Sequence, residues 1–267
     1  MRIGIYQCES RPLAVDENLE RLGRAVESAR PEQVDLLLTP EMFLTGYVIG
    51  PEAVGRLAQP RDGGWARAVG EIARSSGVAV LYGYPERVGE AVHNSIQLVG
   101  SDGSAVANYR KTHLYGDLDR SQFRPSDDVS PVVELGGWRC GMLICYDVEF
   151  PENARGLALA GVDVVLAPTA NMVPYDVVAT TLVPARAYEN QVYVVYANYC
   201  GREADLEYCG LSCVVAPDGK DVARAGRGEE LVVGELDRAR LEESRRKATY
   251  LLDRRPELYR SLSDPRP

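Results

Sequence analysis

The sequence predicts an α/β protein in which one sheet packs on another, and three observations lead to this prediction. Roughly a dozen strand-like segments alternate with about five helix-like segments along the 267 residues. The segment Asp35–Thr39 is almost wholly apolar, which is typical of a strand buried on both faces. No repeat or low-complexity linker divides the chain, and 45% hydrophobic residues can form a large core. We therefore expect one domain over residues 1–267.

The first third of the chain alternates strands with amphipathic helices. In the first predicted helix, apolar residues recur at helical spacing and Asp16 stands where an N-cap is expected. Gly77 is a typical stop for the second helix. The predicted elements are strand Met1–Gln7, helix Asp16–Ala29, strand Asp35–Thr39, a helix between Asp62 and Gly77, and strand Val78–Tyr84.

The middle of the chain changes to paired strands. Turn signals at 101–104 and at Gly136-Gly137 predict two hairpins, and Pro217-Asp218-Gly219 predicts a third. The remaining elements are strands His93–Gly100, Ala105–Arg110, Val132–Leu135, Arg139–Cys145, Val162–Ala167, Tyr193–Tyr199, Ser212–Ala216 and Leu231–Leu236, with helices at Pro151–Ala160 and near Pro184–Gln191. The third hairpin is expected to pair the last two of these strands.

Composition excludes several classes of function. The net charge of 30 − 39 = −9 argues against a protein that tracks nucleic-acid phosphates. The only two histidines, His93 and His113, exclude a three-histidine zinc site, and no H-E-x-x-H pattern occurs. No metal site is therefore expected. If the protein is an enzyme, carboxylates rather than imidazole should carry out its proton transfers.

The six cysteines form no C-x-x-C pair, and a chain of this size needs no disulfide for stability. The sequence also shows no signal-peptide pattern and no run of 18 apolar residues. Reduced thiols in a cytoplasmic protein are the expectation. Most of these cysteines should be small buried hydrophobes.

Two charged residues stand at predicted strand ends. Glu41, in Pro-Glu-Met-Phe-Leu-Thr-Gly-Tyr, follows a buried strand, where α/β proteins place ligands and where apolar surroundings would raise a carboxyl pKa. A helix-capping or surface glutamate is the alternative. Lys111, in Tyr-Arg-Lys-Thr-His-Leu, could offer an ammonium to an oxyanion. A solvated edge-strand lysine is the alternative there.

Cys145 stands at a predicted strand–turn–helix junction, in Ile-Cys-Tyr-Asp-Val-Glu-Phe-Pro-Glu. Such a junction exposes a nucleophile and directs backbone N–H groups at its target, as in the serine elbow of hydrolases. A buried structural cysteine is the alternative. The other five cysteines lack this setting and are predicted to be structural.

Taken together, these three motifs resemble the catalytic motifs of the nitrilase (carbon–nitrogen hydrolase) superfamily, in the same order along the chain. Pro168–Asn171 and Ala185–Asn190 also fit, so the resemblance covers essentially the whole chain. It implies a four-layer αββα sandwich without metal or organic cofactor. It also implies a homodimer or higher homo-oligomer, with the polar tail 254–267 able to reach a partner.

Within the superfamily, the sequence is similar to the aliphatic amidases, and most similar to the lysine-catabolic 5-aminopentanamidases. The stretches that carry this finer resemblance are Tyr82–Arg87, Asp117–Ser121 and Tyr196–Gly201. One position departs from the family, which usually has a second glutamate eight residues after the lysine. Asp119 stands there. It is assigned a supporting role, although a charged loop residue is the alternative.

The resemblance implies a mechanism. Glu41 takes the proton of the Cys145 thiol, the thiolate attacks an amide, and Lys111 with the backbone N–H of Tyr146 holds the oxyanion. A thioester on Cys145 is then hydrolysed. On family grounds, Tyr47 and Asn171 could line the substrate pocket.

The implied substrate, 5-aminopentanamide, carries an ammonium remote from its carbonyl. Glu149, Asp176 and Glu207 are candidates to pair with it, although a structural or surface role is the simpler interpretation of each. A broad-specificity aliphatic amidase, an N-carbamoyl-amine hydrolase or a nitrilase would use the same catalytic residues. A non-catalytic interaction protein would have little reason to keep all three.

Overall fold

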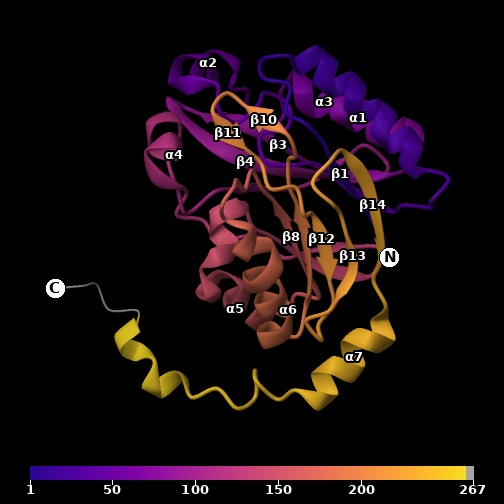
Figure 1. Cartoon of the computed structure of the whole chain (residues 1–267), viewed down its shortest axis with the longest axis vertical. Helices are drawn as coiled ribbons and strands as arrows, with labels where there is room; N and C mark the ends of the chain where they lie inside the picture. Colours follow the sequence, from indigo (N-terminus) through magenta and orange to yellow (C-terminus); the bar gives the residue numbers. More distant parts are fainter. Residues whose placement is uncertain (263–267) are drawn as a thin grey trace.

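A computed structural model describes residues 1–262, and two six-stranded mixed sheets dominate that part of the chain (Figure 1). The first sheet has the strand order β14 (Glu230–Glu235), β1 (Arg2–Gln7), β2 (Leu36–Leu38), β3 (Ala79–Val88), β4 (Ala91–Val99) and β5 (Ala105–Arg110). The second has the order β13 (Asp221–Arg224), β12 (Cys213–Val215), β9 (Tyr193–Ala197), β8 (Val164–Pro168), β7 (Trp138–Met142) and β6 (Val133–Leu135). A small hairpin joins β10 (Arg202–Glu203) to β11 (Leu206–Glu207).

Helices cover the outer faces of the two sheets. On the first sheet lie α1 (Val15–Ala29) and α3 (Gly64–Ser76), and on the second lie α5 (Pro151–Leu159) and α6 (Val183–Asn190) (Figure 1). The other helical elements are α2 (Gly50–Leu57), α4 (Gly116–Gln122), α7 (Arg238–Lys247), and the short turns η1 (Cys145–Glu149), η2 (Val178–Leu182), η3 (Pro256–Leu258) and η4 (Arg260–Leu262). The predicted α/β class with sheet packed on sheet is confirmed.

Two cores explain the apolar runs in the sequence. Leu36 and Leu38 on β2 face the core between the sheets, whereas Leu37 between them faces the core under α1 and α3. All three side chains are fully buried. A strand covered on both faces needs apolar residues at every position, which is why β2 does not alternate with polar residues.

Parallel strands bring the predicted site segments to one region. β2 runs parallel to β1 and β3 in the first sheet, and β8 runs parallel to β7 and β9 in the second. The backbone N–H of Glu41, just after β2, donates to the carbonyl oxygen of Thr169, just after β8, at 3.3 Å. The two sheets are thus joined at the carboxyl ends of these strands, where α/β proteins place ligands.

Several predicted elements are confirmed and others are wrong. The hairpins β4–β5 and β6–β7 are present, and Gly77 ends α3 in the left-handed conformation. Asp16 is not a cap, because α1 begins at Val15 and Asp16 lies in its first turn. The predicted strand ending at Cys145 stops at Met142, and Cys145 opens the turn η1.

The third predicted hairpin has the wrong partner. Across Pro217-Asp218-Gly219, β12 pairs with β13, a short strand that was not predicted. β14 instead pairs with β1 in the other sheet. Local turn chemistry locates a hairpin, but it does not reveal which later segment crosses between sheets.

The described residues that follow α7, 248–262, extend away from the body of the molecule (Figure 1). Asp163 accepts from Arg238 Nη1 at 2.7 Å and from Arg245 Nη1 at 2.9 Å, and these ion pairs hold α7 against the second sheet. Leu252, beyond the helix, is 84% exposed. The predicted interface tail, 254–267, is described only to Leu262. Among the described residues, none of the helices is long and apolar enough to cross a membrane.

Candidate active site

Three charged side chains meet in a fully buried cluster. Lys111 Nζ donates to Glu41 Oε1 at 2.8 Å and to Asp119 Oδ2 at 2.6 Å, and all three residues are 0% exposed. They come from different elements, since Glu41 follows β2, Lys111 follows β5 and Asp119 lies in α4. Burying a charge costs free energy unless the charge is paired. One ammonium between two carboxylates therefore lowers the cost of burying all three groups.

Glu41 has one oxygen that is bonded and one that is not. Oε1 accepts from Lys111 and from Asn94 Nδ2, the latter at 2.6 Å, whereas Oε2 is buried and has no hydrogen-bond partner. Burial raises the pKa of Glu41, an effect that Lys111 opposes and Asp119 reinforces. A carboxylate with a raised pKa and a free oxygen is well suited to accept a proton.

Asp119 makes up for its shorter side chain by close contacts. Besides its bond to Lys111, it accepts from Tyr47 Oη at 2.8 Å and from the backbone N–H of Tyr115 at 2.9 Å. Burial lowers the pKa of Lys111, but Glu41 and Asp119 outweigh it, so this pKa is raised well above its usual value. Lys111 therefore remains an ammonium ion at neutral pH.

Cys145 is the first residue of η1 and adopts φ = +48°, a conformation that non-glycine residues rarely occupy. Strain of this kind often marks functional turns. Burial and the nearby Glu41 raise the pKa of the thiol above its ordinary value of 9.0, whereas Lys111 and hydrogen bonds from Thr169 and Ala170 lower it. Burial dominates, so the resting side chain is a neutral thiol that needs a base.

The structure places the weaker candidates around this cluster. Tyr146 follows Cys145 in the first turn of η1, where backbone N–H groups lack partners within the turn. Tyr47 is fully buried, with its hydroxyl on Asp119. The side-chain amide of Asn171 donates to the carbonyl oxygen of Tyr175 at 2.9 Å and so orders that loop.

Sequence reasoning missed several residues that shape the site. Asn94 lies inside β4, where nothing in the pattern points to Glu41. Thr169 lies in the segment Pro168–Asn171, whose pattern does not indicate a role for its hydroxyl group. A Cβ atom added at Gly83 would lie 2.3 Å from the backbone nitrogen of Met42, so only glycine lets β3 approach the Glu41 segment this closely. Such a close approach leaves no local sequence signal.

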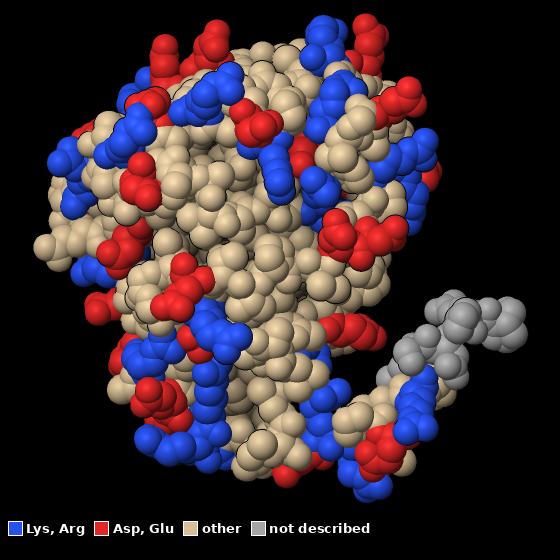
Figure 2. Space-filling model, turned by 180° about the vertical axis from the view of Figure 1, so that it is seen from behind, with Lys and Arg blue, Asp and Glu red and all other residues tan. Residues whose placement is uncertain are grey.

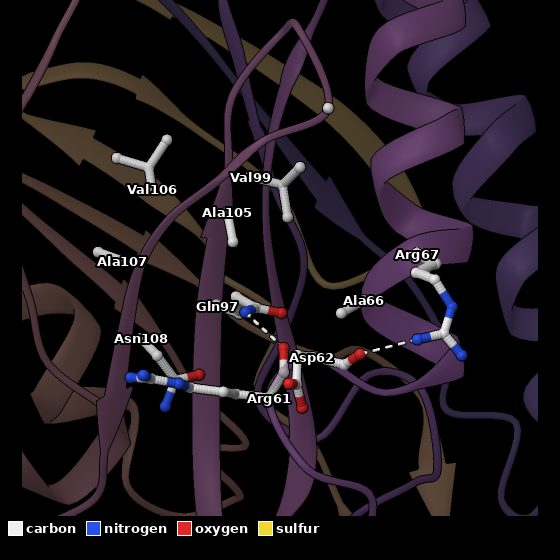
Figure 3. Close-up of a pocket in the computed structure, with 11 residues that line it drawn as sticks. Arg61, Asp62, Ala66, Arg67, Gln97, Val99, Ala105, Val106, Ala107 and Asn108 are labelled. Carbon is white, nitrogen blue, oxygen red and sulfur yellow. Dashed lines mark hydrogen bonds between the residues drawn. The ribbon is translucent and has the colours of Figure 1, made fainter.

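Two cavities differ in their relation to this cluster. One of about 510 Å³ is bordered by Tyr146 and Phe150 of the η1 region and by the Lys111 loop, including His113. The other, of about 450 Å³, lies beside β4 and β5 (Figure 3), and the polar side chains there bond locally, Gln97 Nε2 to Arg61 O and Arg67 Nη1 to Asp62 O. Only the first adjoins the candidate site.

Figure 2 shows acidic and basic side chains interspersed over one face of the molecule, with an uncharged area at its centre. The net charge of −9 is not gathered into one acidic patch on that face.

Comparison with known proteins identifies the family. Residues 2–246 match the carbon-nitrogen hydrolase family. A relative from Pseudomonas protegens, "Hydrolase in pqqF 5'region", is 55% identical over 98% of this chain and 92% of its own length. An (R)-stereoselective amidase from Pseudomonas sp. is 39% identical over 96% of this chain and 92% of its own.

Solved structures agree with these matches. The E41Q/C145A double mutant of the amidase from Nesterenkonia sp. AN1, in complex with acrylamide, has a TM-score of 0.86 at 34% identity and covers 98% of this chain and 97% of its own. Its C145A mutant in complex with butyramide has a TM-score of 0.85 at 35% identity, covering 98% and 96%. The chain therefore belongs to the carbon–nitrogen hydrolase (nitrilase) superfamily and is an amidase with a catalytic cysteine.

Proposed function

We propose that the protein hydrolyses short aliphatic amides through a thioester on Cys145, with Glu41 as the general base. The observation that carries this proposal is the free Oε2 of Glu41, a buried carboxylate oxygen without a partner. It belongs to a group close enough to raise the pKa of the Cys145 thiol. No described histidine joins the cluster, which agrees with proton transfer by a carboxylate.

The reaction proceeds in two halves. Glu41 accepts the thiol proton as sulfur attacks the amide carbon, and the oxyanion accepts hydrogen bonds from Lys111 and from the backbone N–H of Tyr146. Glu41 then protonates the departing nitrogen, so that ammonia leaves and a thioester remains. In the second half, Glu41 takes a proton from water as its oxygen attacks the thioester carbon. The C–S bond then breaks, Glu41 returns the proton to the Cys145 sulfur, and the carboxylic acid leaves and ionises in water. Asp119 and Tyr47 hold the ammonium of Lys111 throughout.

The amidase from Nesterenkonia supports these assignments. One of its structures shows the result of Michael addition of acrylamide at the active site cysteine of the E41Q mutant. The substituted positions carry the numbers of Glu41 and Cys145 in the present chain, and the aligned region covers 98% of it.

For the substrate we propose 5-aminopentanamide, with Glu149 pairing with its ammonium. Glu149 lies in η1 and is half-buried, and its carboxylate has no hydrogen bond or ion pair to any described residue. Of the other candidates, Asp176 pairs with Arg227 at 3.0 Å and Glu207 pairs with Arg202 at 3.3 Å. Glu149 is thus the unpaired carboxylate of the three.

Aromatic rings close to Glu149 also favour a cationic ligand. The hydroxyl of Tyr175, burial and Glu149 all raise the pKa of Tyr115, so Glu149 lies near this ring. Tyr115 makes edge contacts with Tyr146 and with Tyr175, at centroid distances of 5.4 Å and 6.3 Å. Aromatic faces attract ammonium groups by about 0.5–2 kcal/mol. An aliphatic chain that ends in an ammonium would combine these rings with the free carboxylate.

A panel of four substrates tests this assignment: 5-aminopentanamide, pentanamide, a carbamoylated amine and an aliphatic nitrile. We expect the highest kcat/KM for 5-aminopentanamide, and we expect Glu149→Gln to raise KM for that substrate but not for pentanamide. Pentanamide has the same chain without the ammonium, so it isolates the charge. Equal kcat/KM for both amides in the wild type would contradict the proposed substrate.

A broad-specificity aliphatic amidase is the second candidate, because the relative from Nesterenkonia has been solved with the uncharged amides acrylamide and butyramide. Equal turnover of the two pentanamides would favour it. Preferred turnover of the carbamoylated amine or the nitrile would favour the other activities of this scaffold.

We further propose that the protein is a cytoplasmic single-domain enzyme that acts as a homodimer. Exposed apolar side chains on α5, α6 and the C-terminal segment support pairing, because a dimer contact would bury them. In the single chain, exposed fractions of 46–84% are found for Leu159, Tyr188, Tyr250, Leu252 and Leu258. Light scattering should give twice the mass of 29.3 kDa. A monomeric mass at micromolar concentration would contradict the dimer.

A further inference from the structure

Asp147 makes an unusual number of hydrogen bonds for one carboxylate. Its Oδ1 accepts from Thr112 Oγ1 at 2.9 Å and from the backbone N–H of His113 at 2.8 Å, and it lies 3.1 Å from the His113 ring. Its Oδ2 accepts from Tyr109 Oη at 3.0 Å and from the backbone N–H of Ile144 at 3.1 Å. Asp147 is fully buried.

These donors flank the two residues that must meet in the reaction. Tyr109 and Thr112 stand on either side of Lys111 in the chain, and Ile144 directly precedes Cys145. The segment that contains Tyr109 and Thr112 lies at the end of β5 in the first sheet, and Ile144 follows β7 of the second sheet. One carboxylate therefore ties the lysine segment to the cysteine turn across the space between the sheets.

The charged cluster links Lys111 to the cysteine turn only indirectly. Its Nζ bonds to Glu41 and Asp119, which both lie on the side of the first sheet. Glu41 reaches the second sheet through its backbone N–H, which donates to the carbonyl oxygen of Thr169 at 3.3 Å, but among the described residues no hydrogen bond joins Glu41 or Asp119 to η1. The oxyanion, however, must reach both Lys111 and the N–H that follows Cys145, and a misplacement of about 1 Å can cost about 100-fold in rate.

We propose that Asp147 is a positioning residue that sets the distance between the Lys111 ammonium and the Cys145 turn. The inference rests on the proposed roles of Lys111 and Cys145. Loss of the hydrogen bonds to Asp147 leaves the amide substrate bound. It lets the Lys111 ammonium and the backbone N–H after Cys145, the two donors to the oxyanion, move apart. The effect falls on kcat rather than on KM, because only the transition state needs both halves at once.

Two variants each remove one donor and keep the carboxylate: Tyr109→Phe and Thr112→Val. We expect kcat to fall roughly tenfold in each, with KM changed less than about threefold. The matched control is Tyr84→Phe, which removes a buried hydroxyl that donates to Asn108 at 2.8 Å on the far side of the first sheet. The control should keep the wild-type kcat.

A double-mutant cycle separates positioning from general destabilisation. In a Lys111→Met background, Tyr109→Phe should change kcat little, because the group that it positions is already absent. Unchanged kcat in both single variants overturns the inference. An equal loss of kcat with and without Lys111 overturns it as well, since Asp147 would then act independently of the ammonium. If Lys111→Met itself keeps full activity, the proposed function fails instead.

Discussion

Two buried glutamates at the first sheet have opposite character. Glu41 follows β2 and Glu86 lies on β3, and their exposed fractions are 0% and 1%. Burial is the largest influence on both carboxyl groups, and it raises the pKa in each case. In Glu41 the pKa stays raised, whereas in Glu86 hydrogen bonds from Arg110, Asn108 and Ser95 outweigh burial and lower it.

The difference lies in the donors. Both Glu86 oxygens are occupied, Oε1 by Arg110 Nη2 at 2.7 Å and Oε2 by Arg110 Nε at 2.8 Å, with Ser95 and Asn108 also on Oε2. Glu41 keeps Oε2 free. A fully bonded carboxylate stabilises the fold, and one that is buried with a free oxygen can take a proton. Burial alone does not distinguish Glu41 from Glu86, but the hydrogen bonds that each carboxylate oxygen accepts do.

The largest expected effect comes from Glu41→Gln. The amide keeps the shape of the side chain but cannot accept the thiol proton, so we expect kcat to fall roughly 10³–10⁴-fold. Steady-state ammonia release would measure the loss, and circular dichroism would check folding. Activity within tenfold of wild type in a folded variant would mean that another group is the base.

Lys111→Met should have the next largest effect. Methionine fills much of the space of lysine but offers no donor to the oxyanion, and loss of one such donor costs roughly 10²–10³ in kcat. Asp119→Asn provides the comparison, with a smaller loss because the ammonium keeps Glu41 as a partner. If Asp119→Asn behaves like wild type, its supporting role is wrong.

Gly83→Ala tests the positioning of Glu41 without altering a polar group. The added methyl would lie 2.3 Å from the backbone nitrogen of Met42 and push the Glu41 segment away, so we expect kcat to fall about 100-fold. Gly23→Ala in α1 is the control, because a Cβ there has no atom within 4 Å. Full activity in Gly83→Ala would show that the site tolerates this displacement.

Glu86→Gln should change stability and leave kcat nearly unchanged. It breaks a buried ion pair, which costs about 3 kcal/mol in the free energy of unfolding. Because the folded pKa of Glu86 lies below its ordinary value of 4.5, this contribution is present above pH 4.5 and is lost as pH falls through the folded pKa. Urea unfolding at pH 7 and pH 3 should show the gap between wild type and variant shrinking at the lower pH.

Sequence patterns predicted much of the fold because burial on one or two faces leaves a clear periodicity. The β4–β5 hairpin and the end of α3 at Gly77 followed from turn chemistry. The partner of β14 did not, because pairing with β1 joins segments more than 220 residues apart and depends on the assembled sheets. Short polar helices such as α4 carry too little apolar pattern to be found.

The candidate site was predictable only in part, for a similar reason. Glu41, Lys111 and Cys145 each interrupt an apolar segment, so they stand out in the sequence. Asn94 does not, because its role depends on which strand lies beside Glu41. Asp147 was visible in the cysteine motif, but its five contacts come from residues that only the packing of the two sheets brings together.

The most direct test of the central claim, that Glu41 is the base for Cys145, is the pH dependence of Cys145 alkylation by iodoacetamide. The rate should be followed by mass spectrometry of the labelled peptide in wild type, Glu41→Gln and Glu86→Gln. Wild type and Glu86→Gln should share an acid limb above pH 4.5, where Glu41 loses its proton and can take that of the thiol.

In Glu41→Gln that limb should vanish, and alkylation should rise only in the alkaline range, above the ordinary thiol pKa of 9.0, because burial raises the pKa of Cys145. An unchanged acid limb in Glu41→Gln, or its loss in Glu86→Gln, would contradict the account.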